Sequence, residues 1–407
     1  MQFSMKRDTL KNALAALQKI AAAKNHAPMF GITGNVMLSA NANEVILSAT
    51  DLEIAVRMFV SAKTKKQGTI CLPVDVLVNV VAALPAETTI DFKINTRSYV
   101  ATLECGSKTT NIKGIGPESF PGLPTIERFE VDLSSHEMRR LIGCTAFAAS
   151  KEDTRPVLTG VKFLLTDSGL TMVSADGFRL ALVKSEAITG AIDTLIPARA
   201  LIALDKGLAS LEAELESTDI SVQIAYDRAT NKTVFRVPGM YELIVSPIEG
   251  FFPDYNGIIP STFVTHATVE TAALQNALAL QKPFACDSAW ATRMVATDSS
   301  LTLSSVSQEK GDTKALLDAH VEGEPVNISV NMKYMVEGVA VLETDEAMLY
   351  FNGDSAPLML TNKDRDDFLY IVMPMSGERP RPTEKQENLT AQPDEPEEEV
   401  TEEAVEA

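Results

Sequence analysis

The chain has 407 residues, of which 45% are hydrophobic, and this length exceeds one ordinary core and indicates two to four domains. Its 36 basic and 55 acidic side chains give a formal net charge of −19, which argues against a protein that coats nucleic acid by bulk attraction but allows a basic face on an acidic body. No stretch resembles a membrane helix and the first residues are not those of a signal peptide, so we expect a soluble, cytoplasmic protein with no membrane partner.

Three similar stretches follow one another along the chain. Each opens with a short strand at a phenylalanine and continues into an amphipathic helix; these residues are Phe3, Phe129 and Phe263. Alternating apolar and polar residues then predict antiparallel strands over 34–58, 159–184 and 293–318. Another strand and helix follow at 69–84, 194–211 and 326–342, before further strands close each stretch. This order predicts the same α+β unit three times.

Proline and glycine cluster where each unit ends, near 118–124 and 249–260. We therefore expect domains at 1–128, 129–260 and 261–375. The remaining segment, 376–407, holds eleven acidic and three basic side chains with four prolines, so it is predicted to be a disordered acidic tail. The net charge of the rest of the chain is then −11, and any positive surface must be concentrated in one place.

Four short motifs occur in an order and spacing that point to a known family: ATDLE at 49–53, ADGFRLA at 175–181, FPDY at 252–255 and VMPM at 372–375. Over residues 1–375 the chain resembles the bacterial DNA sliding clamps, the beta subunits of DNA polymerase III. The resemblance implies an α+β fold of three tandem DNA-clamp domains, with antiparallel sheets outside and two helices per domain inside. It also implies a head-to-tail homodimer that closes into a ring.

The function implied by this resemblance is topological and not catalytic. A ring around duplex DNA slides without reading bases and tethers the replicative polymerase, which raises processivity. The implied partners are double-stranded DNA, a second copy of the chain, the replicative polymerase, the clamp loader and other proteins that carry clamp-binding peptides. No cofactor is implied, and the expected location is the bacterial cytoplasm, in association with the nucleoid.

Basic residues near the inner helices are the expected DNA-facing groups. The resemblance points to Lys24 and Arg155, and position alone adds Lys151, Arg199, Lys282 and Lys333. The alternative is that each is an ordinary solvated charge. Asp75 stands where the family often has a basic residue, so we expect DNA contact to be biased toward the second and third domains.

Clamp partners insert short peptides into an apolar cleft between the second and third domains. The matching positions here are Leu158, Ala175, Gly177, Phe178, Arg179, Leu180, Pro253, Ile258, Asn331, Tyr334, Pro357, Ile371, Val372, Met373, Pro374 and Met375. The alternative for Leu158, Leu180 and Ile371 is a plain core role. Phe178 replaces a common histidine and Gly257 a common basic residue, which predicts a more apolar cleft than is usual.

The third unit departs most from the pattern, because SSVSQEKGD replaces its aspartate-containing motif and an insertion is expected around 282–291. Leu278 and Leu280 are candidates for the dimer interface, with intradomain core as the alternative. These departures leave open a different function class, a clamp-like acidic scaffold that does not encircle DNA. The tail is expected to add solubility; the alternative is that it screens the partner cleft.

Chemistry-bearing motifs are otherwise lacking in the sequence. Its four histidines show no metal-ligand spacing, and its four cysteines, Cys71, Cys105, Cys144 and Cys286, form no CxxC pair. Asp51, Glu53 and Asp176 occupy equivalent places in successive units, which favours a structural turn over a metal site. We therefore expect neither an enzyme nor a metal protein.

Overall fold

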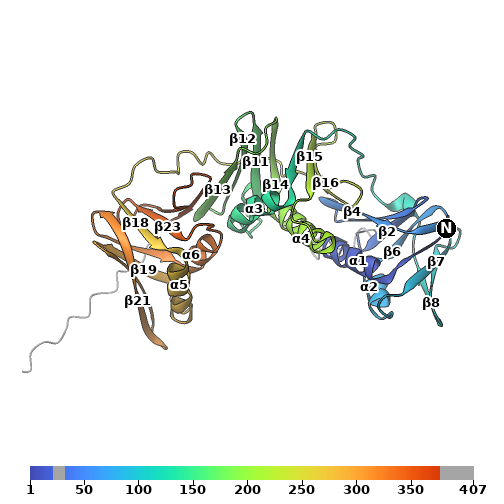
Figure 1. The fold of residues 1–407 in the computed structure, drawn as a ribbon, viewed down its shortest axis with the longest axis horizontal. Helices are drawn as coiled ribbons and strands as arrows, with labels where there is room; N and C mark the ends of the chain where they lie inside the picture. Colours follow the sequence, from blue (N-terminus) through green and yellow to red (C-terminus); the bar gives the residue numbers. More distant parts are fainter. Residues whose placement is uncertain (22–32, 376–407) are drawn as a thin grey trace, which may run out of the picture. The chain divides into compact units, whose positions relative to one another are not determined.

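Each of the three units places a pair of mutually packed helices against antiparallel strands, as Figure 1 shows along the chain. The computed structural model describes residues 1–21 and 33–375. Lys24 and the predicted tail lie outside the described residues. The predicted α+β architecture is confirmed.

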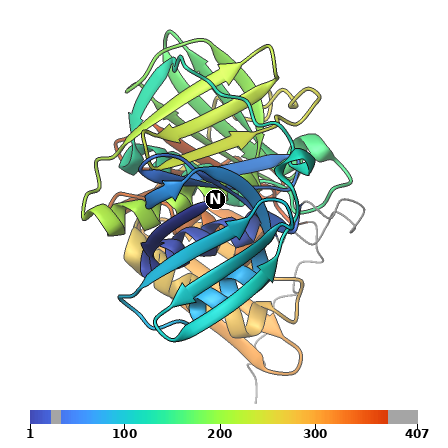
Figure 2. The same ribbon diagram turned by 90° about the vertical axis from the view of Figure 1, so that its right-hand side faces the viewer.

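In the first unit the helices are α1 (Arg7–Ala21) and α2 (Val74–Ala82). The strands are β1 (Gln2–Lys6), β2 (Asn35–Ala40), β3 (Glu44–Thr50), β4 (Ile54–Ser61), β5 (Lys63–Lys66), β6 (Gly68–Pro73), β7 (Thr89–Asn95), β8 (Val100–Cys105) and β9 (Lys108–Lys113). Leu10, Leu14 and Leu17 of α1 are buried, because these residues recur on one helical face. Figure 2 views the chain with this unit in front, in blue and cyan.

In the second unit the helices are α3 (Ser135–Thr145) and α4 (Ala198–Leu215). The strands are β10 (Val131–Ser134), β11 (Gly160–Thr166), β12 (Gly169–Ala175), β13 (Arg179–Ser185), β14 (Ile192–Pro197), β15 (Ser221–Asp227), β16 (Lys232–Val237) and β17 (Tyr241–Val245). Ser134 caps α3 by accepting a hydrogen bond from the Glu137 N–H at 3.2 Å. The Glu137 carboxylate pairs with Arg140, so only half of a capping box forms.

In the third unit the helices are α5 (Thr271–Ala285) and α6 (Met332–Val339). The strands are β18 (Thr265–Glu270), β19 (Ala291–Thr297), β20 (Ser300–Ser307), β21 (Gly311–Gly323), β22 (Val326–Asn331), β23 (Glu346–Phe351), β24 (Leu358–Asn362) and β25 (Phe368–Val372). Asn331 caps α6, since its Oδ1 accepts from the Lys333 N–H at 3.0 Å.

The sheets continue from one unit into the next. The strand orders are β5-β1-β7-β8-β9, then β10-β15-β16-β17-β4-β3-β2-β6, and then β14-β11-β12-β13-β25-β24-β23-β18-β21-β20-β19-β22. The pairing of β4 with β17 joins the first two units, and the pairing of β13 with β25 joins the second to the third. Both pairings are antiparallel, so each domain junction is built from backbone hydrogen bonds.

The segments that connect the units cover these two junctions with apolar side chains. Leu123, Ile126 and Phe129 pack on β4, β16 and β17, while Arg57 donates to the Leu123 and Pro124 carbonyls, each at 2.9 Å. In the same way Phe252 and several neighbouring aromatic and aliphatic residues pack on β13 and β25. The connecting segments therefore belong to the junctions and are not free linkers.

Candidate partner-binding and DNA-facing sites

The partner site predicted from the sequence is built on a tight turn that leads into β13. Asp176 Oδ1 accepts hydrogen bonds from the N–H groups of Phe178 at 2.9 Å and Arg179 at 3.1 Å. Gly177, with φ of +92°, takes the left-handed conformation that this turn requires. The turn holds the Phe178 side chain outward, and the predicted structural role of Asp176 is confirmed.

The first unit contains the same turn with different residues, and the third unit contains a turn that is one residue longer. Asp51 Oδ1 accepts from the N–H groups of Glu53 and Ile54, at 3.1 and 2.7 Å. In the third unit Ser307 Oγ accepts from the second and third residues that follow it, at 3.3 and 3.1 Å. The third unit therefore keeps a side-chain acceptor at the turn although it lacks the aspartate, because a serine hydroxyl supplies it.

Arg179 lies beneath the turn and is buried, with its side chain 4% exposed. Its guanidinium donates to Asp176 Oδ2 at 2.9 Å and to the Phe147 carbonyl at 2.8 Å, and it pairs with Glu337. The Tyr334 ring lies against it, 4.4 Å from the guanidinium carbon. The cationic group is therefore fully engaged and acts as a rigid floor of the site.

Sequence reasoning missed the Glu337 carboxylate and the Phe147 carbonyl, which help to hold Arg179 in place. Asp176 carried a local signal, because it precedes Arg179 by three residues. Burial raises the pKa of Tyr334 and of Tyr370, whose hydroxyl donates to the Tyr334 carbonyl at 3.1 Å. Both phenols are therefore neutral at physiological pH, and the site presents neutral aromatic groups above a buried ion pair.

Backbone contacts bring much of the predicted partner site together. The Met373 N–H donates to the Phe178 carbonyl at 2.8 Å, and Leu180 lies opposite Ile371 in the β13–β25 pair. Phe178 is 63% exposed and Met373 39% exposed. These two side chains, with the half-buried residues Tyr334, Pro374 and Met375, form what is called here the apolar patch.

The remaining predicted cleft residues differ in exposure. The buried ones are Leu158, Leu180, Ile371 and Val372. For the first three, this burial supports the alternative of a core role. Pro253 and Ile258, in the connecting segment, are exposed; Ala175, Asn331 and Pro357 are half-buried. No described hydrogen bond links Pro253 or Pro357 to Phe178, so their place in one site stays a prediction.

The second residues of the second helices occupy equivalent places in the three units, and their charges differ. In α2 this residue is Asp75, whose carboxylate accepts from Gln18 at 3.1 Å. In α4 it is Arg199, which pairs with both Asp51 and Glu53 of the first unit. In α6 it is Lys333, which is exposed and forms no ion pair with any described residue. Arg199 thus serves the junction between the first two units, a role that its predicted DNA-facing assignment did not include.

Three other predicted DNA-facing residues are exposed. Lys151 and Arg155 lie in the loop that follows α3, and Lys282 lies in the last turn of α5. Among residues 1–21 and 33–375, none of the three has an ion-pair partner. Their charges are therefore available to an external anion.

The two leucines proposed for a dimer interface differ in burial. Leu278 is 0% exposed within the core of the third unit, so its assignment to an interface is wrong, and the alternative of intradomain core applies. Leu280 is 51% exposed and remains a candidate. The two side chains differ because they are two residues apart on a helix and so face different directions.

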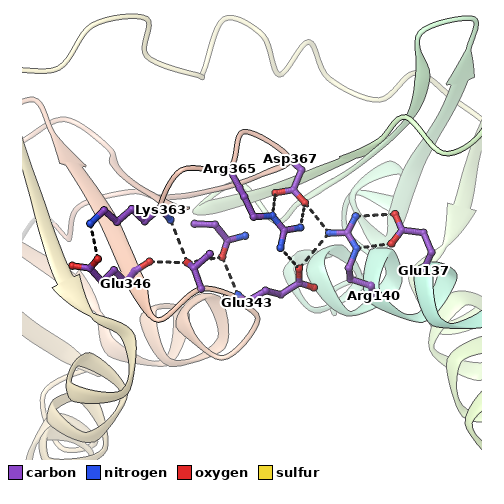
Figure 3. A network of polar contacts seen from close by, with 9 residues as sticks. Glu137, Arg140, Glu343, Glu346, Lys363, Arg365 and Asp367 are labelled. Carbon is purple, nitrogen blue, oxygen red and sulfur yellow. Dashed lines mark hydrogen bonds and ion pairs between the residues drawn. The ribbon is translucent and has the colours of Figure 1, made fainter. Parts of the chain in front are cut away.

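A polar network joins the second unit to the third on the side of α3 (Figure 3). Arg140 pairs with Glu137 on its own helix and with Asp367 of the third unit at 3.0 Å; Glu343 lies 3.8 Å away. Arg365 pairs with the same two third-unit carboxylates. Since the Arg140 side chain is only 13% exposed, this contact is shielded from solvent and reinforces the β13–β25 junction.

The described residues contain no group of three or more histidine, cysteine, aspartate or glutamate side chains that could hold a metal ion. Three of the four cysteines are buried, and Cys286 is half-buried. None of the described helices has the length and apolarity to cross a membrane.

These features define a chain of three clamp-type domains joined edge to edge. Comparison with known proteins then identifies its family. Family models match the DNA polymerase III beta subunit N-terminal domain at residues 1–124, its central domain at 132–254 and its C-terminal domain at 256–376. The beta sliding clamp of Synechococcus elongatus is 28% identical over 92% of this chain and 99% of its own length. That of Staphylococcus aureus is 29% identical with the same coverage.

Solved structures show the same fold. The DNA polymerase sliding clamp from Bacillus subtilis has a TM-score of 0.84 at 24% identity, over 93% of this chain and 99% of its own. The DNA polymerase III beta subunit from Pseudomonas aeruginosa has a TM-score of 0.82 at 20% identity, with coverage of 92% and 99%. The chain belongs to the DNA polymerase III beta subunit family, the bacterial sliding clamps. It is a sliding clamp of DNA replication, a processivity factor and not a catalyst.

Proposed function

We propose that two copies of this chain close head to tail into a ring around duplex DNA, in the cytoplasm, and tether the replicative polymerase through the apolar patch. The observation that carries the proposal is a pair of unpaired strand edges. β9 pairs only with β8, and the 311–318 part of β21 pairs only with β20 among the described strands. Open edges of this kind are templates for another strand.

The internal repeat indicates which edges meet. β9, β17 and β25 are the last strands of their units, whereas β4, β13 and β21 each follow the turn described above. β17 pairs with β4 and β25 with β13, so β9 of one copy is the matching partner for β21 of another. The resulting contact is heterologous, and two such contacts close a ring.

The same repeat predicts the register of this pairing. Val245 lies opposite Ile54 and Val372 opposite Arg179, in each case the residue that faces the turn acceptor across the hairpin. The corresponding residues are Ile112, which comes three residues before the Ile115 bridge to Cys71, and Gly311, which lies opposite Ser307. Thr110 of one copy then faces Thr313 of the other.

Cysteine crosslinking combined with a DNA-retention assay tests the ring. In a Cys286→Ser background, Thr110→Cys with Thr313→Cys is expected to form an intermolecular disulfide, because opposed strand residues have Cβ atoms about 5 Å apart. The control pair is Thr110→Cys with Leu316→Cys, which the register separates by roughly 10 Å. Rings loaded by a clamp loader on nicked circular DNA should remain on the circle and leave once it is cut. Equal retention on circular and linear DNA would favour the acidic-scaffold alternative.

The partner role of the apolar patch rests on its chemistry. Phe178 and Met373 offer apolar area that water now covers, above an Arg179 floor that is already neutralised. Such a surface suits a short peptide with aliphatic or aromatic anchors and disfavours one that relies on acidic groups. The polymerase, the clamp loader and other replication or repair proteins with such peptides are the proposed partners.

A further inference from the structure

We propose that Trp290 is a positioning residue that holds the Lys333 ammonium toward the phosphate backbone of the encircled DNA. This inference rests on the proposed ring function and deepens it, because it assigns a specific contact of the third domain to the nucleic acid. The contact is non-specific in sequence, as a lysine on a phosphate carries no base information.

The Trp290 indole and the Lys333 ammonium both lie at the start of α6. The Lys333 Nζ lies 3.9 Å from the centroid of the Trp290 ring. The Trp290 carbonyl accepts the Met332 N–H at 2.8 Å, so the loop is fixed to the first turn of α6. A cation over an indole face keeps its full charge while its flexible stem is restrained.

The backbone around Trp290 adopts an unusual conformation. Ala289 and Trp290 have φ values of +51° and +65°, the left-handed region that side chains other than glycine disfavour. The Trp290 N–H donates to the Ala285 carbonyl at 2.8 Å and so closes the end of α5. Glycine would close this helix end with less strain, so the turn alone does not explain a tryptophan at this position. The Trp290 ring packs against the main hydrophobic core and also contacts Lys333, so two contacts account for a tryptophan here.

The equivalent positions concentrate positive charge on the third unit. Asp75 is acidic, Arg199 is neutralised by two carboxylates, and Lys333 is left as the unpaired cation of the three. Lys282, in the last turn of α5 just before this loop, is also exposed and unpaired among the described residues. On a chain with a net charge of −19, such a local excess of cations suits an anionic ligand that the rest of the surface repels.

A mutant cycle with a salt titration tests the proposal. Binding of a short labelled duplex to the dimer is measured by anisotropy between 50 and 200 mM salt for Lys333→Ala, Trp290→Ala, Trp290→Phe and the Trp290→Ala/Lys333→Ala double variant. Loss of one lysine per chain should lower the slope of log K against log salt by about two per ring. Trp290→Ala should weaken binding about two- to threefold, Trp290→Phe should stay near wild type, and the double variant should match Lys333→Ala.

Two results would overturn the inference: an unchanged salt slope in Lys333→Ala, or equal further losses from Trp290→Ala with and without Lys333. If the Trp290 indole had a merely structural role, Trp290→Ala would lower the thermal stability but leave the salt slope of DNA binding unchanged. Because Trp290 is the single tryptophan of the chain, its emission should also change when DNA binds, and an unchanged emission counts against contact. Retention of wild-type rings on circular DNA separates these failures from failure of the ring proposal itself.

Discussion

Arg140 of the second domain donates a 3.0 Å hydrogen bond from Nη1 to Oδ2 of Asp367 in the third domain. The two residues are far apart in sequence, and the contact lies beside the β13–β25 pair that joins their domains. A buried guanidinium with carboxylates on both domains resists separation of the two, because parting would strand charged groups at low dielectric.

Replacing Arg140 should therefore weaken the junction. We expect Arg140→Met, which keeps the aliphatic stem, to lower the free energy of unfolding in urea by about 2 kcal/mol, since several charged hydrogen bonds are lost together. The matched control is Arg365→Met, whose side chain is 39% exposed and shares the same carboxylates. It should cost less than about 1 kcal/mol. Equal losses in the two variants would contradict the special role of Arg140.

The change in folding stability at acidic pH provides a separate test. Hydrogen bonds from Arg140 lower the pKa of Glu137 below its ordinary value of 4.5. Because the folded pKa lies below the unfolded one, the stabilisation is fully present above pH 4.5 and is lost as the pH falls through the folded value. We expect Glu137→Gln to be less stable than wild type at pH 7 and the difference to shrink toward pH 3. Melting temperatures over this range check the prediction, and a constant difference would refute it.

Leu52 occupies the turn position that Gly177 holds in the second domain. Its φ is +80°, which a leucine disfavours, and its side chain is 46% exposed, so little burial would be lost on its removal. Leu52→Gly is expected to raise the free energy of unfolding by about 1 kcal/mol, whereas Gly177→Ala should lower it. Urea titrations of both variants measure the effect, and destabilisation by Leu52→Gly would show that the leucine side chain is needed for packing.

Phe178 should dominate peptide binding at the apolar patch. We expect Phe178→Ala to weaken binding of a synthetic clamp-binding peptide about tenfold, because a buried aromatic anchor contributes about 1.5 kcal/mol. Phe251, which is 97% exposed in the connecting segment, is the matched control, and Phe251→Ala should bind normally. Fluorescence polarisation gives both affinities, and neither substitution should shift the melting temperature by much. Equal weakening by the two substitutions would count against the patch.

Thiol reactivity should separate the four cysteines. Burial raises the pKa of Cys71 to about 11 and that of Cys144 to about 12, so almost no thiolate forms at pH 8. Cys105 is also buried, whereas Cys286 is half-buried. A chromogenic disulfide reagent should therefore modify one thiol per native chain quickly and all four after denaturation. Loss of the fast phase in Cys286→Ser is the control.

The repeated strand and helix pattern could be predicted from the sequence because apolar spacing reports which face of each element is buried. Leu10, Leu14 and Leu17 are examples, and the caps at Ser134 and Asn331 are local signals of the same kind. The β4–β17 and β13–β25 pairings could not be predicted in this way, because they join edges far apart in sequence that no local pattern matches.

The site residues show the same distinction between those with a local sequence signal and those without one. Phe178 and Met373 were predicted and are exposed, whereas Glu337, which pairs with Arg179 from another helix, carried no local signal. Leu278 was assigned to the wrong environment because an apolar residue on a helix can face the core or a partner with the same local pattern. Ser307 shows a further limit, since it replaces an aspartate and its hydroxyl still accepts the hydrogen bonds of the turn.

The unpaired edges of β9 and β21 make the size of an assembly depend on the angles between successive units. Complementary ends that belong to the same chain add copies until the accumulated rotation reaches a full turn, and otherwise they grow into an open filament. Every copy repeats the same angles at β4–β17 and β13–β25, so a small error at one junction is multiplied around the circle. Stiff junctions such as that of Arg140 therefore determine how many copies the assembly contains as well as how stable each copy is.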